Sequence, residues 1–254
     1  MSWNPQQYLK FEQPRLRPAF DLLNRLSCEP QRIYDLGCGT GNLTRLLAER
    51  WPSAQVTGVD DSAEMLARAA ETPSSIHWVQ QSLANWQPTR RADLIFSNAA
   101  LHWLPDHARV FARLVDALEP GGVLAVQMPR NFQAPSHTLI DETVRNGPWR
   151  NRLEGMMVSS PVAEPEFYYR LLEGYAAALD IWETEYLHVL EGNDAVKEWT
   201  KGTWLKRFLD ALEQPERSAF EDAYAARVKR AYSILDSGRT LFPFRRLFLV
   251  MQKK

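Results

Sequence analysis

The sequence predicts an α/β protein built on a doubly wound, mostly parallel β-sheet, and three observations support this class. An apolar run at residues 33–36 breaks into three alternate glycines and continues into a stretch with helical spacing. Apolar runs of strand length then alternate with helical stretches as far as Met128. Two more strand-like runs follow, which gives an expected total of seven strands. Because no repeat, low-complexity segment or linker interrupts the chain, residues 1–254 are expected to form a single domain.

The expected elements follow from hydrophobic period and from end signals. The predicted strands are residues 33–36, 56–60, 76–80, 93–98, 123–128, 181–190 and 244–251. The predicted helices begin after the glycines, at Asp61-Ser62, at Pro105, near Asp194 and at Pro215, and the last two extend to Leu212 and Tyr232. The predicted strand at 93–98 has a continuous apolar run at residues 94–96, so it is expected to be buried on both faces.

Each part of the chain has an expected task. Residues 1–30 are predicted to form an N-terminal helical flap, and residues 31–128 the half that binds a cofactor. The alternation lapses over residues 129–174, and an insertion at this edge of a sheet is suited to a substrate lid. Residues 175–254 are expected to complete the sheet with strands and helices.

Composition excludes several classes of protein. Hydrophobic residues make up 45% and charged residues 24% of the chain, as in soluble globular proteins, and the net charge is −1. This balance gives no electrostatic footprint for a nucleic acid or an anionic membrane. The chain has no basic-then-apolar leader at Met1 and no long apolar run, which predicts a cytoplasmic location. Two cysteines cannot build a disulfide framework, and the five histidines are too scattered for a metal site.

The glycine turn indicates which ligand the sheet holds. Gly37, Gly39 and Gly41 let the backbone approach a ligand closely, but Asn42 stands where a dinucleotide fingerprint needs its third glycine. Asp35 precedes the turn, and its charge opposes a pyrophosphate at the helix N-terminus. The same carboxylate suits an ammonium or a sulfonium group. S-adenosylmethionine carries both groups and no phosphate, so it is the expected cofactor.

Further residues are expected to complete the cofactor site at the carboxyl ends of the strands. Asp60 ends the second predicted strand, where its carboxylate would accept both ribose hydroxyls, and Asp61 adjoins it. Met65 is placed to pack on the adenine ring, and Ser82 and Leu83 lie where the edge of the adenine would be read. Asn98, at the end of the fourth predicted strand, completes the predicted set.

Nearly the whole chain resembles the class I S-adenosylmethionine-dependent methyltransferases, which have a Rossmann-like fold. Within that family it is most similar to enzymes that methylate a carboxylate of a small polycarboxylic acid such as trans-aconitate. The matching stretches are residues 3–5, 8, 15, 17–18, 35–39, 41–42, 85–88, 93–96, 98–99, 103–107, 122–129, 168–169, 180–182 and 246–248. Two positions depart from the family pattern. Ser82 stands in place of an acid, and His102 stands in place of an amide side chain that faces the methyl acceptor.

The resemblance implies an in-line methyl transfer that needs alignment and dehydration but no acid or base, because the attacking carboxylate is already ionised at neutral pH. The remaining carboxylates of the acceptor need partners, and guanidinium groups bind carboxylates in a bidentate manner. The residues expected to bind the acceptor are Tyr8, Arg15, Arg17, His102, Trp103, His137, Tyr168 and Arg245, and Arg150 and Arg152 are further candidates. Whether Arg15 or Arg17 holds the carboxylate of the cofactor instead is left open.

Two other functions remain open at this point. The chain could methylate a carrier-bound acyl carboxylate or an amine, although residues 98–101 lack the Asn/Asp-Pro-Pro-aromatic pattern of amino-group methyltransferases. It could also bind the cofactor and regulate a partner without catalysis, which the serine at position 82 favours. A dehydrogenase is a more distant alternative.

Overall fold

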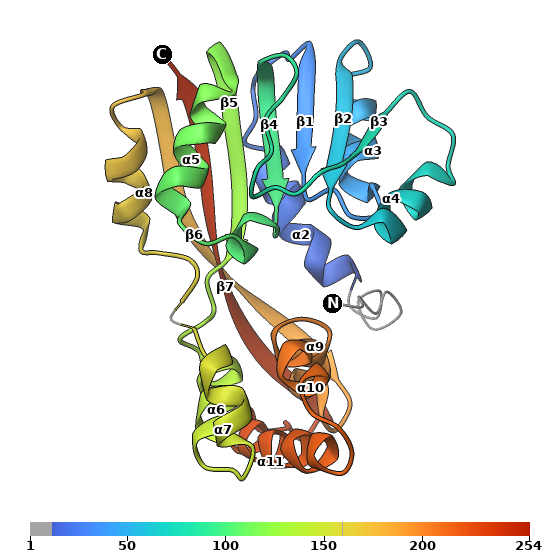
Figure 1. The fold of residues 1–254 in the computed structure, drawn as a ribbon, viewed down its shortest axis with the longest axis vertical. Coiled ribbons are helices and arrows are strands. Elements are labelled where there is room, and N and C mark those ends of the chain that lie inside the picture. Colours follow the sequence, from blue (N-terminus) through green and yellow to red (C-terminus); the bar gives the residue numbers. More distant parts are fainter. Residues whose placement is uncertain (1–11, 159) are drawn as a thin grey trace. The chain divides into compact units, whose positions relative to one another are not determined.

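The computed structural model describes the backbone of residues 12–158 and 160–254 and the side chains from Leu16 onward, apart from residue 159. Its centre is a seven-stranded sheet in the order β3-β2-β1-β4-β5-β7-β6 (Figure 1). The strands are β1 (Arg32–Leu36), β2 (Gln55–Asp60), β3 (His77–Gln80), β4 (Ala92–Asn98), β5 (Leu118–Pro129), β6 (Ala176–Glu191) and β7 (Arg239–Lys253). Strands β1 to β5 pair in parallel, whereas β7 runs antiparallel to β5. The predicted doubly wound, mostly parallel sheet is therefore confirmed.

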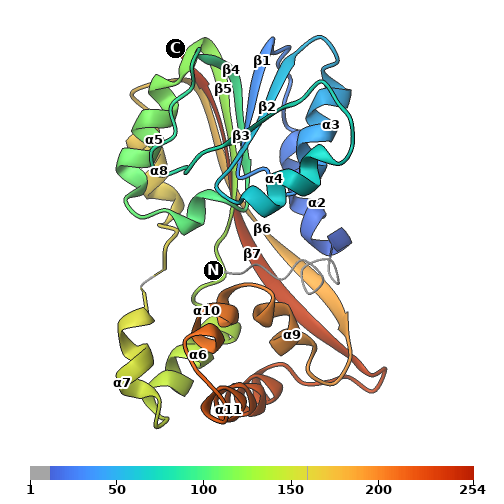
Figure 2. The same ribbon diagram turned by 45° about the vertical axis from the view of Figure 1, so that its right-hand side comes forward.

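The described residues also form helices, and some of these cover the two faces of the sheet. The helices are α2 (Glu12–Leu23), α3 (Asn42–Arg50), α4 (Ala63–Ala70), η1 (Leu101–Trp103), α5 (His107–Asp116), α6 (Pro135–Arg145), α7 (Arg150–Leu153), η2 (Glu154–Met156), α8 (Pro165–Leu172), α9 (Ala195–Lys201), α10 (Trp204–Asp210) and α11 (Glu216–Ala231). Figure 2 shows α5 and α8 on one side of the sheet and α2, α3 and α4 on the other.

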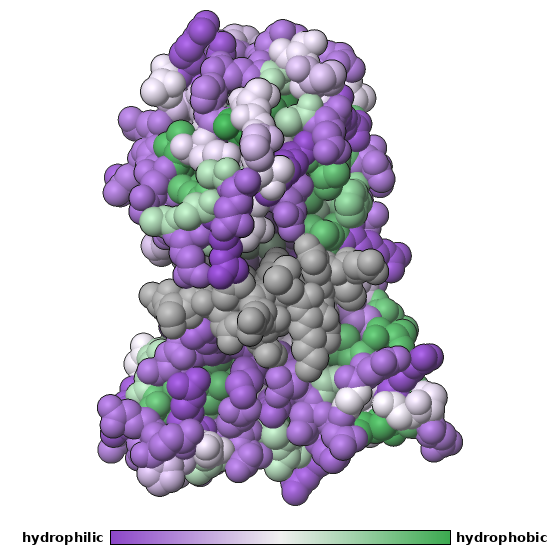
Figure 3. All heavy atoms as spheres, turned by 90° about the vertical axis from the view of Figure 1, so that its right-hand side faces the viewer, coloured by the Kyte–Doolittle hydropathy of each residue, from purple (hydrophilic) through white to green (hydrophobic). Residues whose placement is uncertain are grey.

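Burial explains why the central strands are so apolar. Ile33 on β1, Leu94 and Ile95 on β4, and Leu124 on β5 are all fully buried, because helices cover both faces of the sheet. On the face of the molecule drawn in Figure 3, hydrophilic side chains predominate and hydrophobic ones form separate groups between them.

Two predicted helix boundaries are corrected by the structure. The single helix expected near Asp194 to Leu212 is two helices, α9 and α10, which meet at Gly202 and Thr203. Thr203 has φ −140° and ψ −106°, which is outside the helical region, so the helix cannot continue through it. The helix expected from Pro105 begins at His107, because the carboxylate of Asp106 accepts the backbone N–H of Arg109 and caps it.

The chain divides into two compact units rather than following the predicted boundaries. Unit 1 is residues 1–17, 130–160 and 185–245, and unit 2 is residues 18–129, 161–184 and 246–254. The stretch 129–174 expected to act as a lid is therefore split between the two units.

Packing explains the division of the predicted lid. Helices α6 and α7 share a hydrophobic core with α9, α10 and α11, which includes Trp149, Phe208 and Phe220. Helix α8 instead packs on α5 in unit 2, where the rings of Phe111 and Tyr168 lie 5.1 Å apart.

Candidate functional site

The glycine turn follows β1 directly and has the backbone that only glycine adopts readily. Gly37, Gly39 and Gly41 all have positive φ angles, of 79°, 54° and 77°. A Cβ atom on Gly37 would collide with the side chain of Ala100, so the turn lies against the segment that follows β4. Apart from its two neighbours in the chain, the described residues place no atom within 4 Å of the position that a Cβ on Gly39 would take, so the backbone there is open to a ligand.

Asp60 connects this turn to the next helix. One carboxylate oxygen, Oδ2, accepts the backbone N–H of Gly39 at 2.9 Å, and the other accepts the N–H of Ser62 at 2.9 Å. The side chain of Ser62 caps α4 by accepting the N–H of Met65 at 3.3 Å. The carboxylate of Asp60 is only half-buried, and each of its oxygens keeps a lone pair for a ligand. Asp61 is exposed beside it.

Asp35 is a buried carboxyl group beneath the turn. It is 2% exposed, and its Oδ2 accepts the hydroxyl of Thr44 at 2.6 Å. Burial raises the pKa of Asp35 to about 7, and the charge of Asp60 adds to this rise while the bond from Thr44 opposes it. A cation bound nearby would reverse the shift, so the group suits a positively charged ligand.

Cys38 lies within the same turn and is not an active nucleophile. Burial and the negative charges of Asp35 and Asp60 raise the pKa of its thiol, so the thiol stays protonated.

The segment expected to read the adenine edge is held from α5. Arg113 donates to the backbone carbonyl of Leu83 at 3.0 Å and to that of Ala84. The hydroxyl of Ser82 accepts the N–H of Ala84 at 3.3 Å, so it shapes the same turn. The prediction from sequence missed Arg113, because no local pattern connects an arginine on a helix to a loop 30 residues earlier.

The end of β4 combines strain with an unpaired polar atom. Ala99 has a φ angle of 53°, a conformation that costs a non-glycine residue energy and often marks a functional site. Its N–H donates to the carbonyl of Gln127 at 2.9 Å. The Oδ1 atom of Asn98 is buried and accepts no hydrogen bond from the described residues. A ligand that donates to Oδ1 would satisfy it.

The short helix η1 carries the two aromatic residues predicted to face the methyl acceptor. His102 is buried and Trp103 is 51% exposed, and their rings lie 4.6 Å apart. His107 fixes this helix from α5, because its Nε2 lies 3.1 Å from the carbonyl of Leu101 and must donate to it. The Nδ1 of the neutral ring therefore accepts the hydroxyl of Tyr168, at 2.6 Å.

The structure corrects the interpretation of Tyr168 as a residue that binds the acceptor. Its side chain is fully buried between α5 and α8, and its hydroxyl also accepts the N–H of Ala163 at 3.2 Å. These contacts hold η1, α5 and α8 together, so Tyr168 is a positioning residue. Its neighbour Tyr169 is 51% exposed.

The remaining residues predicted to bind the acceptor belong to unit 1 or lie outside the described residues. The guanidinium of Arg17 lies 5.2 Å from the ring centre of Tyr186, and that of Arg245 lies 3.8 Å from the carboxylate of Glu185. His137 packs against Phe132 and Trp204, and burial lowers its pKa to about 4, so it is neutral at pH 7. Tyr8 and the side chain of Arg15 lie outside the described residues.

Arg150 and Arg152 are already used in exposed ion pairs. Arg150 pairs with Glu154 at 2.8 Å and Arg152 with Glu216 at 2.5 Å. Both arginines are therefore weaker candidates for a substrate carboxylate than the sequence suggested.

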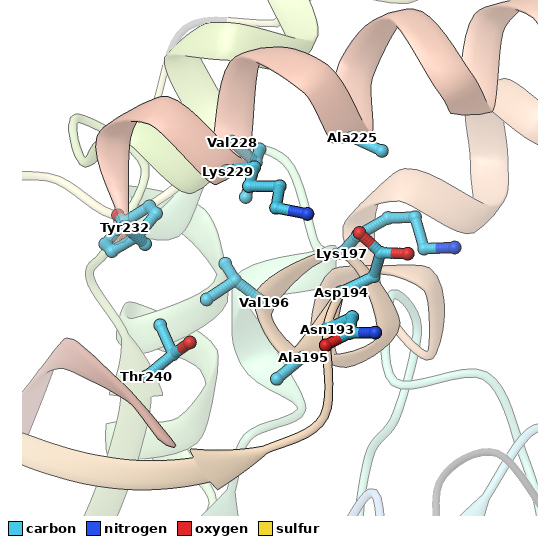
Figure 4. A pocket seen from close by; sticks show the side chains of 10 residues that line it. All are labelled: Asn193, Asp194, Ala195, Val196, Lys197, Ala225, Val228, Lys229, Tyr232 and Thr240. Atoms are coloured by element: carbon cyan, nitrogen blue, oxygen red, sulfur yellow. The ribbon is translucent and has the colours of Figure 1, made fainter. Parts of the chain in front are cut away.

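The hollows of the surface lie away from these residues. One is bordered by α9, α11 and the start of β7 in unit 1 (Figure 4), but its enclosed space of about 10 Å³ is no larger than a water molecule needs. Another, of about 280 Å³, lies in unit 2 at the amino-terminal end of β5, beside Arg25, Cys28 and Asp180. Neither contains a residue of the glycine turn, so we place the site from its side chains instead.

The described residues hold no group of three or more His, Cys, Asp or Glu residues placed to bind a metal ion. None of their helices combines the length and the apolar character needed to cross a membrane.

Comparison with known proteins agrees with this geometry. Residues 33–122 match the family described as a methyltransferase domain. The trans-aconitate 2-methyltransferase of Azoarcus sp. (strain BH72) is 47% identical over 98% of both chains. The enzymes of that name from Rhodopseudomonas palustris (strain BisB18) and Rhizobium rhizogenes are 46% and 44% identical and cover at least 99% of both chains.

Solved structures of more distant proteins share the fold. Haemonchus contortus phosphoethanolamine N-methyltransferase 2, solved with phosphomonomethylethanolamine and S-adenosylhomocysteine, is 16% identical with a TM-score of 0.55, and the match covers 94% of this chain and 53% of that one. The plantazolicin methyltransferase BamL is 14% identical with a TM-score of 0.54, and the match covers 98% and 91% of the two chains. On the strength of the full-length relatives, the chain belongs to the trans-aconitate 2-methyltransferase family.

Proposed function

We propose that this protein transfers a methyl group from S-adenosylmethionine to a carboxylate of trans-aconitate, which yields the monomethyl ester and S-adenosylhomocysteine. The observation that carries the proposal is the 47% identity, over 98% of both chains, to a relative named for this reaction. The glycine turn with its two acids supports the same cofactor on physical grounds.

The residues of unit 2 fit this cofactor. The half-buried carboxylate of Asp60 would accept the ribose hydroxyls, and the segment of Ser82 and Leu83, held by Arg113, would border the adenine. Asp35 and the unpaired Oδ1 of Asn98 supply negative charge and an acceptor for the ammonium group. The open backbone at Gly39 leaves room for close contact. Met65 is buried in α4 and would pack beside the base.

The protein contributes position and dehydration to the reaction. Bound S-adenosylmethionine supplies an activated methyl group on a sulfonium centre. A carboxylate acceptor is ionised at pH 7 and needs no base, which agrees with the pKa of about 4 that makes His137 a weak base and with Cys38 being protonated. Holding the acceptor in line is worth on the order of 7–11 kcal/mol of the barrier, which exceeds any single hydrogen bond.

The proposal also includes the residues that would surround the methyl acceptor. Arg17 and Arg245, which the sequence also suggested, are exposed in unit 1, where their guanidinium groups already contact Tyr186 and Glu185. His102 and Trp103 on η1 would border the acceptor and exclude water from it. Both cysteines are free, which agrees with action in the cytoplasm.

The direct test is turnover with S-adenosylmethionine that carries a labelled methyl group. The purified protein is incubated with trans-aconitate and a panel of other di- and tricarboxylates, and the product is tested for a methyl ester that base hydrolyses. Asp60→Ala is the matched inactive control, since it removes the acceptor for the ribose. Cofactor binding without turnover on any acid would point to a regulatory module, and an acid-stable N-methyl product would point to an amine acceptor.

A further inference from the structure

Three polar residues lie in one row across β4, β5 and β7, at the carboxyl ends of β4 and β5. Asn98 on β4 is opposite Gln127 on β5, and Gln127 is in turn opposite Phe248 on β7. Opposite residues of paired strands share a face of the sheet, and so do residues two apart on one strand. Arg246, two residues before Phe248, therefore lies on the same face as Asn98 and Gln127, and its Nη1 is 3.4 Å from Oε1 of Gln127.

This polar row is placed where a ligand is expected. Strands β1, β4 and β5 are parallel, so the row lies at the same end of the sheet as the glycine turn. Its face is the one on which Arg25 lies, just after α2, because the guanidinium of Arg25 is 4.9 Å from the ring centre of Trp182 and Trp182 stacks on Phe248 at 4.9 Å.

The row is buried, and buried polar groups lower the stability of the protein unless hydrogen-bond partners satisfy them. Gln127 is fully buried and Arg246 is 5% exposed. Among the described residues, neither Nε2 of Gln127 nor Oδ1 of Asn98 has a hydrogen-bond partner. Native proteins rarely leave such atoms unsatisfied, and a bound ligand is one of the usual reasons.

The order of donors and acceptors along the row indicates the chemistry of that ligand. Asn98 presents an acceptor on β4, next to the turn that we assign to the cofactor, whereas Gln127 presents an amide donor and Arg246 a guanidinium. A carboxylate accepts from both donors. Neighbouring strands are about 4.8 Å apart, so these donors lie one and two strands beyond Asn98, away from the nucleoside side of the sheet. That position favours the acceptor over the cofactor as the source of the carboxylate.

We infer that Gln127 and Arg246 form a subsite for a carboxylate of the methyl acceptor that is not itself methylated. The inference rests on the proposed function. It assigns to Arg246 the binding of an acceptor carboxylate, which the sequence had suggested for Arg245. Arg245 is exposed on the same strand and pairs with Glu185, so the two adjacent arginines form a natural comparison.

The experiment compares Arg246→Lys and Arg246→Met with the same substitutions at Arg245. Steady-state kinetics give kcat and KM for trans-aconitate, and calorimetry gives the Kd of S-adenosylhomocysteine and the Kd of trans-aconitate in its presence. Loss of a charged, bidentate hydrogen bond is expected to raise KM and Kd for the acid by about 10- to 100-fold in Arg246→Met. The Kd of S-adenosylhomocysteine is expected to stay within about 2-fold, and the Arg245 variants to change acid binding by less than about 5-fold.

A second variant distinguishes a loss of acid binding from a folding defect. Gln127→Glu places a carboxylate beside Arg246, where it pairs with the guanidinium and keeps the buried charge compensated while repelling an anion. We expect the melting temperature to be kept or raised and acid affinity to fall by at least 10-fold. Trans-glutaconate is trans-aconitate without its central carboxylate. If that carboxylate is the one bound, Gln127→Glu should reduce the affinity for trans-glutaconate less than the affinity for trans-aconitate.

The outcomes separate this subsite from the proposed function. Turnover of trans-aconitate with unchanged acid KM in the Arg246 and Gln127 variants would overturn the subsite and leave the function standing. Weaker binding of S-adenosylhomocysteine with unchanged acid KM would overturn it too, because the carboxylate would then belong to the cofactor. A wild-type protein that neither binds nor methylates any acid would overturn both.

Discussion

Burial raises the pKa of Asp35 to about 7 from a usual value of 3.8. Between about pH 4 and pH 7, the folded protein without ligand therefore keeps a proton on Asp35 that the unfolded chain releases. Because the unfolded state binds fewer protons in this pH range, the free energy of unfolding falls as pH rises from about 4 to about 7 and is level above it. A cation bound beside Asp35 would expel the proton, so cofactor affinity is expected to rise with pH over the upper part of the same range.

Replacement of this one carboxyl group is the first prediction at the residue scale. Asp35→Asn should abolish the fall in stability between pH 4 and 7, weaken S-adenosylhomocysteine by about 10- to 100-fold at pH 8, and make its Kd independent of pH. Urea denaturation and calorimetry between pH 5 and 8 measure both effects. Thr44→Val is the matched control: it removes the hydrogen bond that lowers the pKa, so the pH dependence should move upward. An unchanged pH profile in Asp35→Asn would contradict the assignment.

Arg113 carries a second prediction at this scale. Its guanidinium holds the carbonyls of Leu83 and Ala84, so Arg113→Gln should loosen the segment assigned to the adenine. The Kd of S-adenosylhomocysteine is expected to rise about 5- to 20-fold, with the KM of the acid nearly unchanged. Arg109→Gln on the exposed side of the same helix should have no effect. Equal losses in both variants would mean that the charge of α5, rather than the shape of the loop, is what matters.

At the scale of elements, the pair of His107 and Tyr168 connects η1, α5 and α8. Tyr168→Phe leaves the buried Nδ1 of His107 without its donor, which should cost about 1–3 kcal/mol of stability. Because the side chain of Tyr168 is fully buried and its hydroxyl is engaged by His107 and Ala163, the KM for trans-aconitate should change by less than about 2-fold. Thermal unfolding and kinetics of this variant are compared with Tyr169→Phe, whose exposed side chain predicts no change in either. A raised KM with unchanged stability would restore the original interpretation of Tyr168.

The helices and strands show which parts of the structure local sequence patterns can predict. All seven strands, the glycine turn with Asp35 and Asp60, and the end of β4 at Asn98 follow from hydrophobic period and from the spacing of glycines and acids. The patterns could not show that α8 packs on α5 while α6 joins α9 to α11, because that depends on long-range packing. The choice between Arg245 and Arg246 was also out of reach. Adjacent residues of a strand point to opposite faces, and only the register with β5 identifies the buried one.

At the scale of the whole molecule, the proposed binding tasks belong to one of the two units. Asp35, Asp60 and Asn98 belong to unit 2, together with the polar row. Each unit has buried aromatic residues of its own, such as Phe111 in unit 2 and Phe220 in unit 1, both with 0% exposure. Damage to the core of unit 2 should therefore weaken binding more than damage to the core of unit 1.

Matched truncations of these two phenylalanines test that assignment. Phe220→Ala removes a ring packed on Trp149 and should destabilise unit 1 by about 3–5 kcal/mol, seen as faster hydrogen exchange in α6, α7 and α11. The Kd of S-adenosylhomocysteine and the KM of the acid should both stay within about 2-fold. Phe111→Ala should weaken the binding of the cofactor and of the acid and speed exchange in α5 and α8, because it removes the ring beside His107 and Tyr168. If both variants weaken binding equally, the two units unfold together and the assignment of both binding tasks to unit 2 fails.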